Sequence, residues 1–281
     1  MAPTAFFEPS DDGRLYPTRY SHSLWAPNTL HGPAVCGVAA RRAEAEFGRN
    51  GFRPARFTID LFKAARTDPT DTVGRVVRDG GRIRVVEVDV VQYRADSPEP
   101  VTVGRSTTVF VRESTNPPGE RWERPAEYPT GPEVPADDLL SYFSRADDAD
   151  PVWSHDMSPM QAPVRKRLWT AGVPIVTNEP LTPFVRTVIA AESTSLVGNW
   201  GSGGIGFINC DLTVVLARLP HDGRVIVETD SHVEFDGIST STASLYDASG
   251  QFATGAVVGV NNAAAEIDFT VVDTRERYAE G

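Results

Sequence analysis

The chain has 281 residues, of which 38 are acidic and 27 basic, and its formal net charge is −11. A field of this sign repels phosphate backbones, so the composition excludes a general nucleic-acid-binding protein. The two cysteines, Cys36 and Cys210, are too few for a disulfide framework and lack the spacing of a metal site, so we expect buried thiols. No basic leader is present and no apolar run approaches about 18 residues, which predicts a cytoplasmic protein without a membrane span.

The first half of the chain is expected to hold one helix followed by an antiparallel meander. After a short strand at 5–9, a helix is predicted at 33–47, because Pro33 suits the first helical turn and Gly48 can cap the end. The many Gly and Ala residues of this helix indicate that a strongly curved sheet wraps closely around it. Partial alternation and β-branched residues predict four strands, at 55–65, 72–77, 82–93 and 101–111.

Residues 116–163 differ from the first half, because Pro, Glu and Asp are dense and the periodicity is lost. Such a composition is typical of a long connection between two domains. An apolar patch at 139–143 interrupts it, and Trp122 and Trp153 lie within it. We expect these parts of the connection to pack on the surface of the domains.

The second half is expected to repeat the first. Thr182 is predicted as the N-cap of a second helix with Pro183 in its first turn, and Val185, Val188 and Glu192 lie along one helix face. A Gly-rich loop follows at 198–206. Four strands are then predicted, at 208–216, 225–233, 239–247 and 251–260.

A nearly constant offset relates the two halves, which predicts an internal duplication. The offset is 150 residues between Pro33 and Pro183, and 151 between Asp60 and Asp211. It recurs in two further pairs, Asp79 with Asp230 and Gly104 with Gly255. Two copies of a helix-plus-curved-sheet unit are implied, and pairing of their strands edge to edge would remove the exposed edges.

The duplicated pattern resembles the double-hotdog acyl-CoA thioesterases of the bacterial acyl-CoA thioesterase II type. The motifs that carry the resemblance are Leu30-His31-Gly32-Pro33, Val77-Arg78-Asp79-Gly80, Ile205-Gly206-Phe207, and Cys210-Asp211-Leu212 with the following Arg218. The resemblance implies an α+β fold, a tandem (double) hotdog in which two curved antiparallel sheets each wrap around a central helix. It further implies an N-terminal hotdog at 1–115, a linker at 116–165, a C-terminal hotdog at 166–281, and further pairing into homo-oligomers.

The resemblance also implies a water-activating trio of an Asp, a Thr or Ser, and a Gln in the second half. Asp211 matches the Asp, and the hydroxyl position falls at Ser231 or His232. The Gln position falls at Val257 or Val258, so the Gln is replaced. This departure matters because a Gln supplies a donor and an acceptor, whereas a Val supplies neither.

Thioester hydrolysis needs a positioned water, a base and donors for the developing oxyanion. A helix start offers unpaired N–H groups and a positive dipole end, so both predicted helices are candidates, around Gly32 and Pro183. Because Pro33 has no N–H, the donors expected in the first half are the amides of Ala34 and Val35. His31 precedes this helix, where it would either bind substrate or cap backbone groups.

Charged residues outside the trio are also candidates. Asp60, the counterpart of Asp211, is expected to be structural, whereas Glu192 would have a raised pKa if its helix face is buried. The phosphates of coenzyme A need local cations, and Arg66 and Arg218 are equivalent in the two halves. Lys63, Arg53 and Arg49 lie near Arg66 in sequence, although an ordinary solvated strand edge would look the same.

The sequence thus favours an acyl-CoA thioesterase that cleaves its substrate to a free acid and coenzyme A. The replaced Gln favours an alternative, a non-catalytic protein that binds acyl-CoA or lipid. A hotdog hydratase acting on enoyl-CoA is less favoured, because no Asp follows His31 at hydrogen-bonding spacing. No metal cluster and no dinucleotide fingerprint is found in the sequence, so no cofactor is expected.

Overall fold

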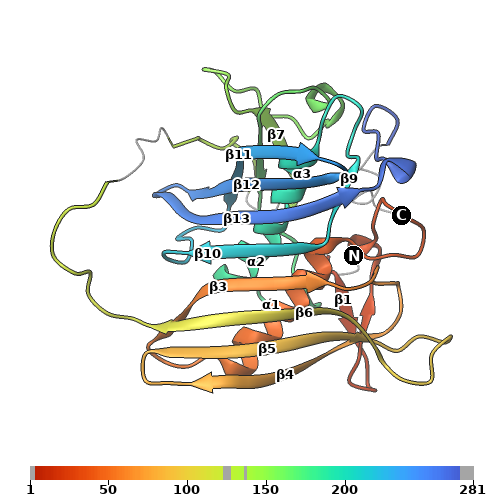
Figure 1. Ribbon diagram of the computed structural model, residues 1–281, viewed down its shortest axis with the longest axis vertical. Coiled ribbons are helices and arrows are strands. Elements are labelled where there is room, and N and C mark those ends of the chain that lie inside the picture. The colour runs from red at the N-terminus through yellow and green to blue at the C-terminus, as the bar shows by residue number, and fades with distance from the viewer. Residues whose placement is uncertain (1–3, 123–127, 136–137, 273–281) are drawn as a thin grey trace.

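One antiparallel sheet runs through the molecule, and its strands and helices are drawn in Figure 1. The structure is a computed structural model that describes residues 4–122, 128–135 and 138–272. The strands are β1 (Phe7–Pro9), β2 (Leu15–Pro17), β3 (Phe52–Leu61), β4 (Thr70–Asp79), β5 (Ile83–Gln92), β6 (Val101–Arg112), β7 (Tyr142–Arg145), β8 (Lys166–Thr170), β9 (Phe207–Asn209), β10 (Asp211–Leu216), β11 (Val225–Phe235), β12 (Ile238–Asp247) and β13 (Gly250–Asn261). Their order is β1-β2-β4-β5-β6-β3-β10-β13-β12-β11-β8-β7, and β9 pairs with β13.

The helices α1 (Gly32–Phe47), α2 (Pro183–Glu192) and α3 (Thr194–Asn199) lie together behind the sheet in Figure 1. Helix α1 packs on β4, β5 and β6, and α2 packs on β10, β11 and β13, because each helix buries its apolar face against the strands of its own half. Three short 3-10 turns complete the structure, at Arg19–Ser21, Ser158–Met160 and Ala263–Ala265. Among the described residues, none of the helices has both the length and the apolar character to cross a membrane.

The predicted elements of both halves are confirmed, apart from their ends and one interruption. The predicted strand at 208–216 is divided at Cys210 into β9 and β10, because Asn209 pairs with Gly259 whereas Thr213 pairs with Ala256. The register therefore slips by one residue between these two pairs. The short helix α3 was not predicted, since its sequence runs into the Gly-rich loop.

The two halves meet where β3 pairs with β10, which confirms the predicted edge-to-edge pairing. Asp60 and Asp211 are direct partners across this seam. The offset of 151 residues also relates these two residues, so the seam pairs corresponding positions of the two halves.

Helices α1 and α2 lie side by side and run antiparallel. Gly32 at the start of α1 lies against Glu192 at the end of α2, and Thr182, which precedes α2, donates a hydrogen bond to Glu44 near the end of α1. A Cβ on Gly37 would lie 2.3 Å from Ile175 Cδ1 and 3.2 Å from Ile189 Cγ1. The small residues of α1 therefore permit close packing on α2 and its preceding loop, and not only on a curved sheet as the sequence suggested.

Part of the segment expected as a connection extends the sheet. Strand β7 lies within it, and β8 begins where it ends; β7 pairs with β8, which pairs with β11. Trp153 packs near Trp169 and donates from Nε1 to Thr130 O (3.0 Å). Trp122 is 84% exposed, so the expectation that it packs on a domain is wrong. Cys36 is buried as predicted, whereas Cys210 is only half-buried.

Candidate active site

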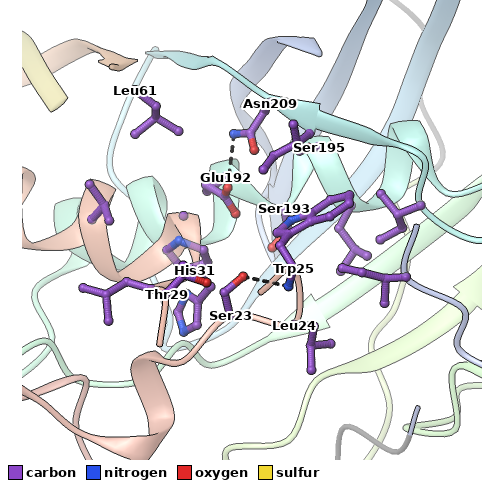
Figure 2. A pocket seen from close by; sticks show the side chains of 18 of the residues that line it. Ser23, Leu24, Trp25, Thr29, His31, Leu61, Glu192, Ser193, Ser195 and Asn209 are labelled. Carbon is purple, nitrogen blue, oxygen red and sulfur yellow. Dashed lines mark hydrogen bonds between the residues drawn. The ribbon is translucent and has the colours of Figure 1, made fainter. Parts of the chain in front are cut away.

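A cavity of about 680 Å³ opens at the end of the helix pair where α1 begins and α2 ends. Its lining includes the loop before α1, the end of β3, the turn between α2 and α3, and β9. The segments around Phe143, Met157 and Phe269 also contribute. Its walls are mainly apolar, with few polar groups, as is typical of a site for a small organic ligand. Figure 2 shows the labelled side chains around its centre.

The loop before α1 holds the start of the helix in one arrangement. His31 is the N-cap, and its Nδ1 accepts from Ala34 N (3.3 Å) while the opposite ring nitrogen, Nε2, donates to Tyr20 O (2.8 Å). The backbone N–H of His31 donates to Ser21 O (2.9 Å). His31 therefore caps the backbone, as one of the two sequence interpretations held, and its ring also lines the cavity.

These caps decide which backbone donor the helix start can offer a ligand. The N–H of Ala34 is taken by His31, and Pro33 has none. Val35 lies one residue further on, where the regular helical hydrogen bonds begin. Gly32 is the first residue of α1 and has no intrahelical acceptor, so its N–H is the donor at this helix start. The expectation that Ala34 and Val35 supply the donors is thereby corrected.

Glu192, the last residue of α2, carries the carboxyl group of the cavity. Its side chain is buried, with 9% of the residue exposed, and Asn209 Nδ2 donates to its Oε1 (3.2 Å; Figure 2). Burial raises the pKa of Glu192 to about 7, while the Asn209 hydrogen bond lowers it. A carboxyl group with this pKa exchanges its proton near neutral pH, as a general acid or base requires.

The carboxyl of Glu192 lies against the start of α1. A Cβ added at Gly32 would fall 1.8 Å from Glu192 Oε1, so any side chain at this position would displace the Glu192 carboxyl. The positive end of the α1 dipole thus faces a buried carboxyl. The cavity therefore brings together a carboxyl group and a backbone donor that are 160 residues apart in the sequence.

The titratable neighbours of Glu192 come mainly from α1. Cys36 is buried behind Gly32, and the pKa of its thiol is raised by burial and by the charge of Glu192. The His31 ring lies at the helix start, and Lys63 lines the cavity where β3 ends. Lys63 is exposed, so it lies at the mouth of the cavity, beside Phe62, which is 51% exposed.

Asp211 lies outside the cavity lining, at the seam between the halves. Its Oδ1 accepts from Val258 N (2.6 Å), because the carbonyl of Cys210, which would otherwise face this N–H, accepts from Leu61 N (2.8 Å). Burial raises the pKa of Asp211, the Val258 hydrogen bond lowers it, and the nearby Asp60 raises it. The structure thus brings Asp211 next to the position expected for the family Gln.

Ser231 and His232 lie on β11, and β13 and β12 separate this strand from β10, which holds Asp211. Both are exposed and are absent from the cavity lining. Ser231 pairs with Thr242 Oγ1 (2.9 Å), and His232 lies 2.9 Å from Ser241 Oγ. The structure therefore does not bring them to Asp211.

The predicted substrate-binding residues divide into two groups. His31, Gly32 and Val35 line the cavity, whereas Ala34 is fully buried and Arg66 and Arg218 point elsewhere. The Arg66 guanidinium pairs with Asp96 (2.7 Å). Arg218 makes a two-pronged ion pair with the buried Asp247 and holds the pKa of that carboxyl down at about 2. Neither arginine faces the cavity.

Sequence reasoning missed Asn209 and assigned no role to Ser195 or Trp25, all of which line the cavity. Asn209 also donates to Asp211 O (3.2 Å), so it links β9 to β10 as well as to Glu192. An Asn at the end of a short strand is a weak signal by itself, and no pattern in the sequence points to it. Within the described residues, no group of three or more His, Cys, Asp or Glu side chains could hold a metal ion.

Comparison with known proteins identifies the fold. The structure resembles a conserved protein with a hot dog fold from Alicyclobacillus acidocaldarius (TM-score 0.60, 13% identity, covering 90% of this chain and 94% of that one). It is also similar to the acyl-CoA thioesterase II TesB2 of Mycobacterium marinum (TM-score 0.59, 14% identity, 91% and 94%) and to the tesB protein of Mycobacterium avium subspecies paratuberculosis (0.56, 14%, 91% and 95%). The chain therefore has the hot dog fold.

One part of the sequence matches a known family model. Residues 21–111 match the family model of the acyl-CoA thioesterase N-terminal domain, and this range contains α1, β3 to β6 and the loop that caps α1. A search of curated proteins finds no match. The match at residues 21–111 agrees with the resemblance drawn from the sequence.

Proposed function

We propose that the protein is an acyl-CoA thioesterase and that Glu192, not Asp211, is the carboxylate that activates water. The observation that carries this proposal is the buried Glu192 carboxyl against the start of α1, inside a cavity of about 680 Å³. The family match of residues 21–111 supports the reaction class. The position of Asp211, with its Oδ1 bonded to Val258 N, supports a structural role for that residue.

In the proposed reaction Glu192 acts as a general base. Ionised Glu192 takes a proton from water as the water oxygen bonds to the thioester carbonyl carbon. The oxyanion accepts a hydrogen bond from Gly32 N–H at the positive end of α1. The carbon–sulfur bond then breaks, and the proton held by Glu192 passes to the departing thiolate, which yields a carboxylic acid and coenzyme A.

The remaining parts of the substrate are assigned by exposure and charge. The apolar interior of the cavity suits the acyl chain, whereas coenzyme A is charged and belongs outside. Lys63 is an exposed cation at the mouth and takes the role that sequence reasoning gave to Arg66 and Arg218. A phosphate group of coenzyme A can pair with Lys63 at the mouth of the cavity without either charge being buried.

We further propose that the two halves are tandem hot dog domains, a double hotdog. The equivalence of Asp60 and Asp211 across the seam supports this assignment, as does the packing of one helix on the strands of each half. The domain limits remain those predicted, 1–115 and 166–281, with 116–165 between them. The pairing of β7 with β8 attaches the middle segment to the second domain.

The test is release of free thiol from a panel of acyl-CoA substrates by the wild-type protein and two variants. Glu192→Gln is expected to abolish hydrolysis, because an amide cannot take a proton from water. Asp211→Asn is expected to retain most of it, since the amide oxygen still accepts from Val258. Loss of activity in Asp211→Asn with Glu192→Gln unaffected would restore the trio assignment.

A second candidate, a non-catalytic protein that binds acyl-CoA, is favoured by the Val that replaces the family Gln. Calorimetry with a non-hydrolysable thioether analogue separates the two candidates. Binding of the analogue without hydrolysis of any acyl-CoA in the panel would establish the binding protein and contradict the enzyme. Hydrolysis by the wild-type protein would exclude it.

A further inference from the structure

Part of the cavity is walled by buried side chains from the middle segment, from the loop before β9 and from the segment after β13. Five of them form what we call the inner wall: Phe143, Met157, Ile205, Ile267 and Phe269. Each is buried, with 3 to 7% of the residue exposed. Phe143 and Met157 come from the middle segment, and Ile267 and Phe269 from the segment after β13.

Trp200 and Lys166 pack behind the inner wall and support it. Trp200 lies behind it, with its ring centroid 5.6 Å from that of Phe143 and 4.8 Å from that of Phe269. The Lys166 ammonium lies over the Trp200 ring and donates to Trp200 O (2.6 Å). Lys166 also donates to Ala162 O (2.9 Å) and Val164 O (3.0 Å), so it ties the end of the middle segment to α3.

The chemistry of the inner wall defines its ligand. All five side chains are apolar, so a charged or strongly polar group there would lose its hydration without gaining a partner. A hydrocarbon chain or ring gains free energy from the same burial. The inner wall and Glu192 line one continuous cavity, so a thioester at Glu192 would extend its acyl group toward this wall.

We propose that the inner wall sets the acyl-chain length of the substrate and that Met157 is a specificity-determining residue. This inference rests on the proposed function and assigns its substrate class, a coenzyme A thioester with an extended or bulky apolar acyl group. Met157 lies in the middle segment, so the connection between the two halves takes part in substrate selection. Its unbranched side chain fills space without fixing a rigid shape.

The experiment compares Met157→Ala with a matched control in the same turn. Met160 has the same burial, 7% exposed, and lies three residues further on, but it is absent from the cavity lining. Values of kcat/KM are measured for straight-chain acyl-CoAs of increasing length with wild type, Met157→Ala and Met160→Ala. Met157→Phe adds bulk at the same position and serves if the Ala variant fails to fold.

Met157→Ala removes three heavy atoms from the wall, so we expect its optimum to move to chains longer by about two to three carbons. We expect Met157→Phe to move the optimum to shorter chains. Each methylene that no longer fits costs about tenfold or more in kcat/KM. Met160→Ala is expected to lower thermal stability comparably while leaving the optimum unchanged.

The outcomes separate this inference from the proposed function. An unchanged optimum in folded Met157 variants, or an equal shift in Met160→Ala, overturns the inference alone. If no acyl-CoA is hydrolysed, the same comparison is made by calorimetry with thioether analogues. If the analogue that binds best is then longer for Met157→Ala than for wild type, the inference on Met157 is supported although the enzyme proposal fails. Absence of binding at every length overturns both.

Discussion

The two ends of the antiparallel helix pair are equivalent by duplication and differ in chemistry. At the cavity end His31 caps α1 and Gly32 is the first helical residue; at the opposite end Thr182 caps α2 and Pro183 is the first. The caps are 151 residues apart, the offset that relates Asp60 to Asp211. Gly32 therefore corresponds to Pro183, and the sequence alignment of Pro33 with Pro183 is off by one residue.

This shift by one residue decides which helix begins with a residue that has a backbone N–H. Gly32 has a backbone N–H, and its missing side chain leaves room for the Glu192 carboxyl. Pro183 has no N–H, so the start of α2 lacks the corresponding donor. The counterpart of Glu192 by the same offset is Arg41, which donates from two nitrogens to Glu179 (2.6 and 2.5 Å).

Glu44, the carboxyl group at the opposite end of the helix pair, has a structural role. Glu44 accepts a hydrogen bond from the Thr182 hydroxyl, and burial raises its pKa while this bond lowers it. The Thr182 hydroxyl also accepts from Val185 N (3.2 Å), so Glu44 supports a helix cap. Both ends of the helix pair therefore have a capped helix start and a nearby carboxyl group. Only the cavity end combines an available backbone donor, a carboxyl group and space for a ligand.

The largest expected effect comes from removing one carboxyl group at each end. Glu192→Gln should lower kcat/KM by about 10² to 10⁴, the contribution of general base catalysis. Glu44→Gln should leave it within about twofold, because Gln can still accept from Thr182. Thiol release under identical conditions measures both. An equal loss in the two variants would mean that the helix pair, and not the cavity end, controls activity.

A smaller but still large effect is expected from a methyl group at each helix start. Gly32→Ala places a Cβ on the Glu192 carboxyl, and a displacement of about 1 Å at reacting groups costs about 10²-fold in rate. The added methyl group should also overpack this position and lower the free energy of unfolding by about 1–3 kcal/mol.

The control for that variant is Pro183→Ala at the equivalent position. It supplies an N–H to α2 but no cavity carboxyl, so activity should stay at the wild-type level. Kinetics and urea unfolding of both variants provide the comparison. Full activity in a correctly folded Gly32→Ala variant would contradict the assignment of Gly32 as the oxyanion donor.

Local features of this fold could be predicted from the sequence. The Thr182 cap, the end of α1 at Gly48 and the edge-to-edge pairing of the two halves all follow from short patterns or from a repeated interval. Each of these features can be predicted from residues that are adjacent in the sequence or from the comparison of the two halves. Strand β8 was missed, because its five residues lie at the end of a polar segment and gain their partners only from β7 and β11.

The candidate site could be predicted only in part. The apolar face of α2 indicated that Glu192 would have a raised pKa, and His31 and Gly32 were recognised at the helix start. Glu192 lies close to His31 and Gly32 because α1 and α2 pack antiparallel at a short distance that Gly32 permits. No local sequence pattern encodes this packing. The role of Asp211 depends on the slip between β9 and β10, which leaves the Val258 N–H for its carboxylate.

The third expected effect concerns stability against pH, and it follows from the burial of Glu192. Its pKa in the folded protein is about 7, above the ordinary 4.5, so between these values the folded state binds more protons than the unfolded state. Stability should therefore fall as pH rises from 4.5 to 7, by about 3 kcal/mol for this group.

Glu192→Gln has no proton to lose, so it should be more stable than wild type at pH 8 and similar to it near pH 4.5. Denaturant unfolding of both proteins at the two pH values gives the difference, in which contributions from other groups cancel. The same measurement on Glu44→Gln gives the separate contribution of the carboxyl group at the opposite end, whose pKa burial also raises. A constant difference between wild type and Glu192→Gln across this range would mean that Glu192 is not held protonated by burial.

The smallest expected effect tests the opposite end alone. Thr182→Ala removes the side-chain cap of α2 and the hydroxyl partner of Glu44, and loss of such a cap costs about 1 kcal/mol. Thr182→Ser keeps both hydrogen bonds and should restore the stability. Activity should be unchanged in both variants, because the cavity lies at the other end of α1. A loss of kcat/KM in Thr182→Ala larger than its loss of stability explains would show that the end of α1 transmits strain to Gly32, and the two ends would then be coupled through the helix.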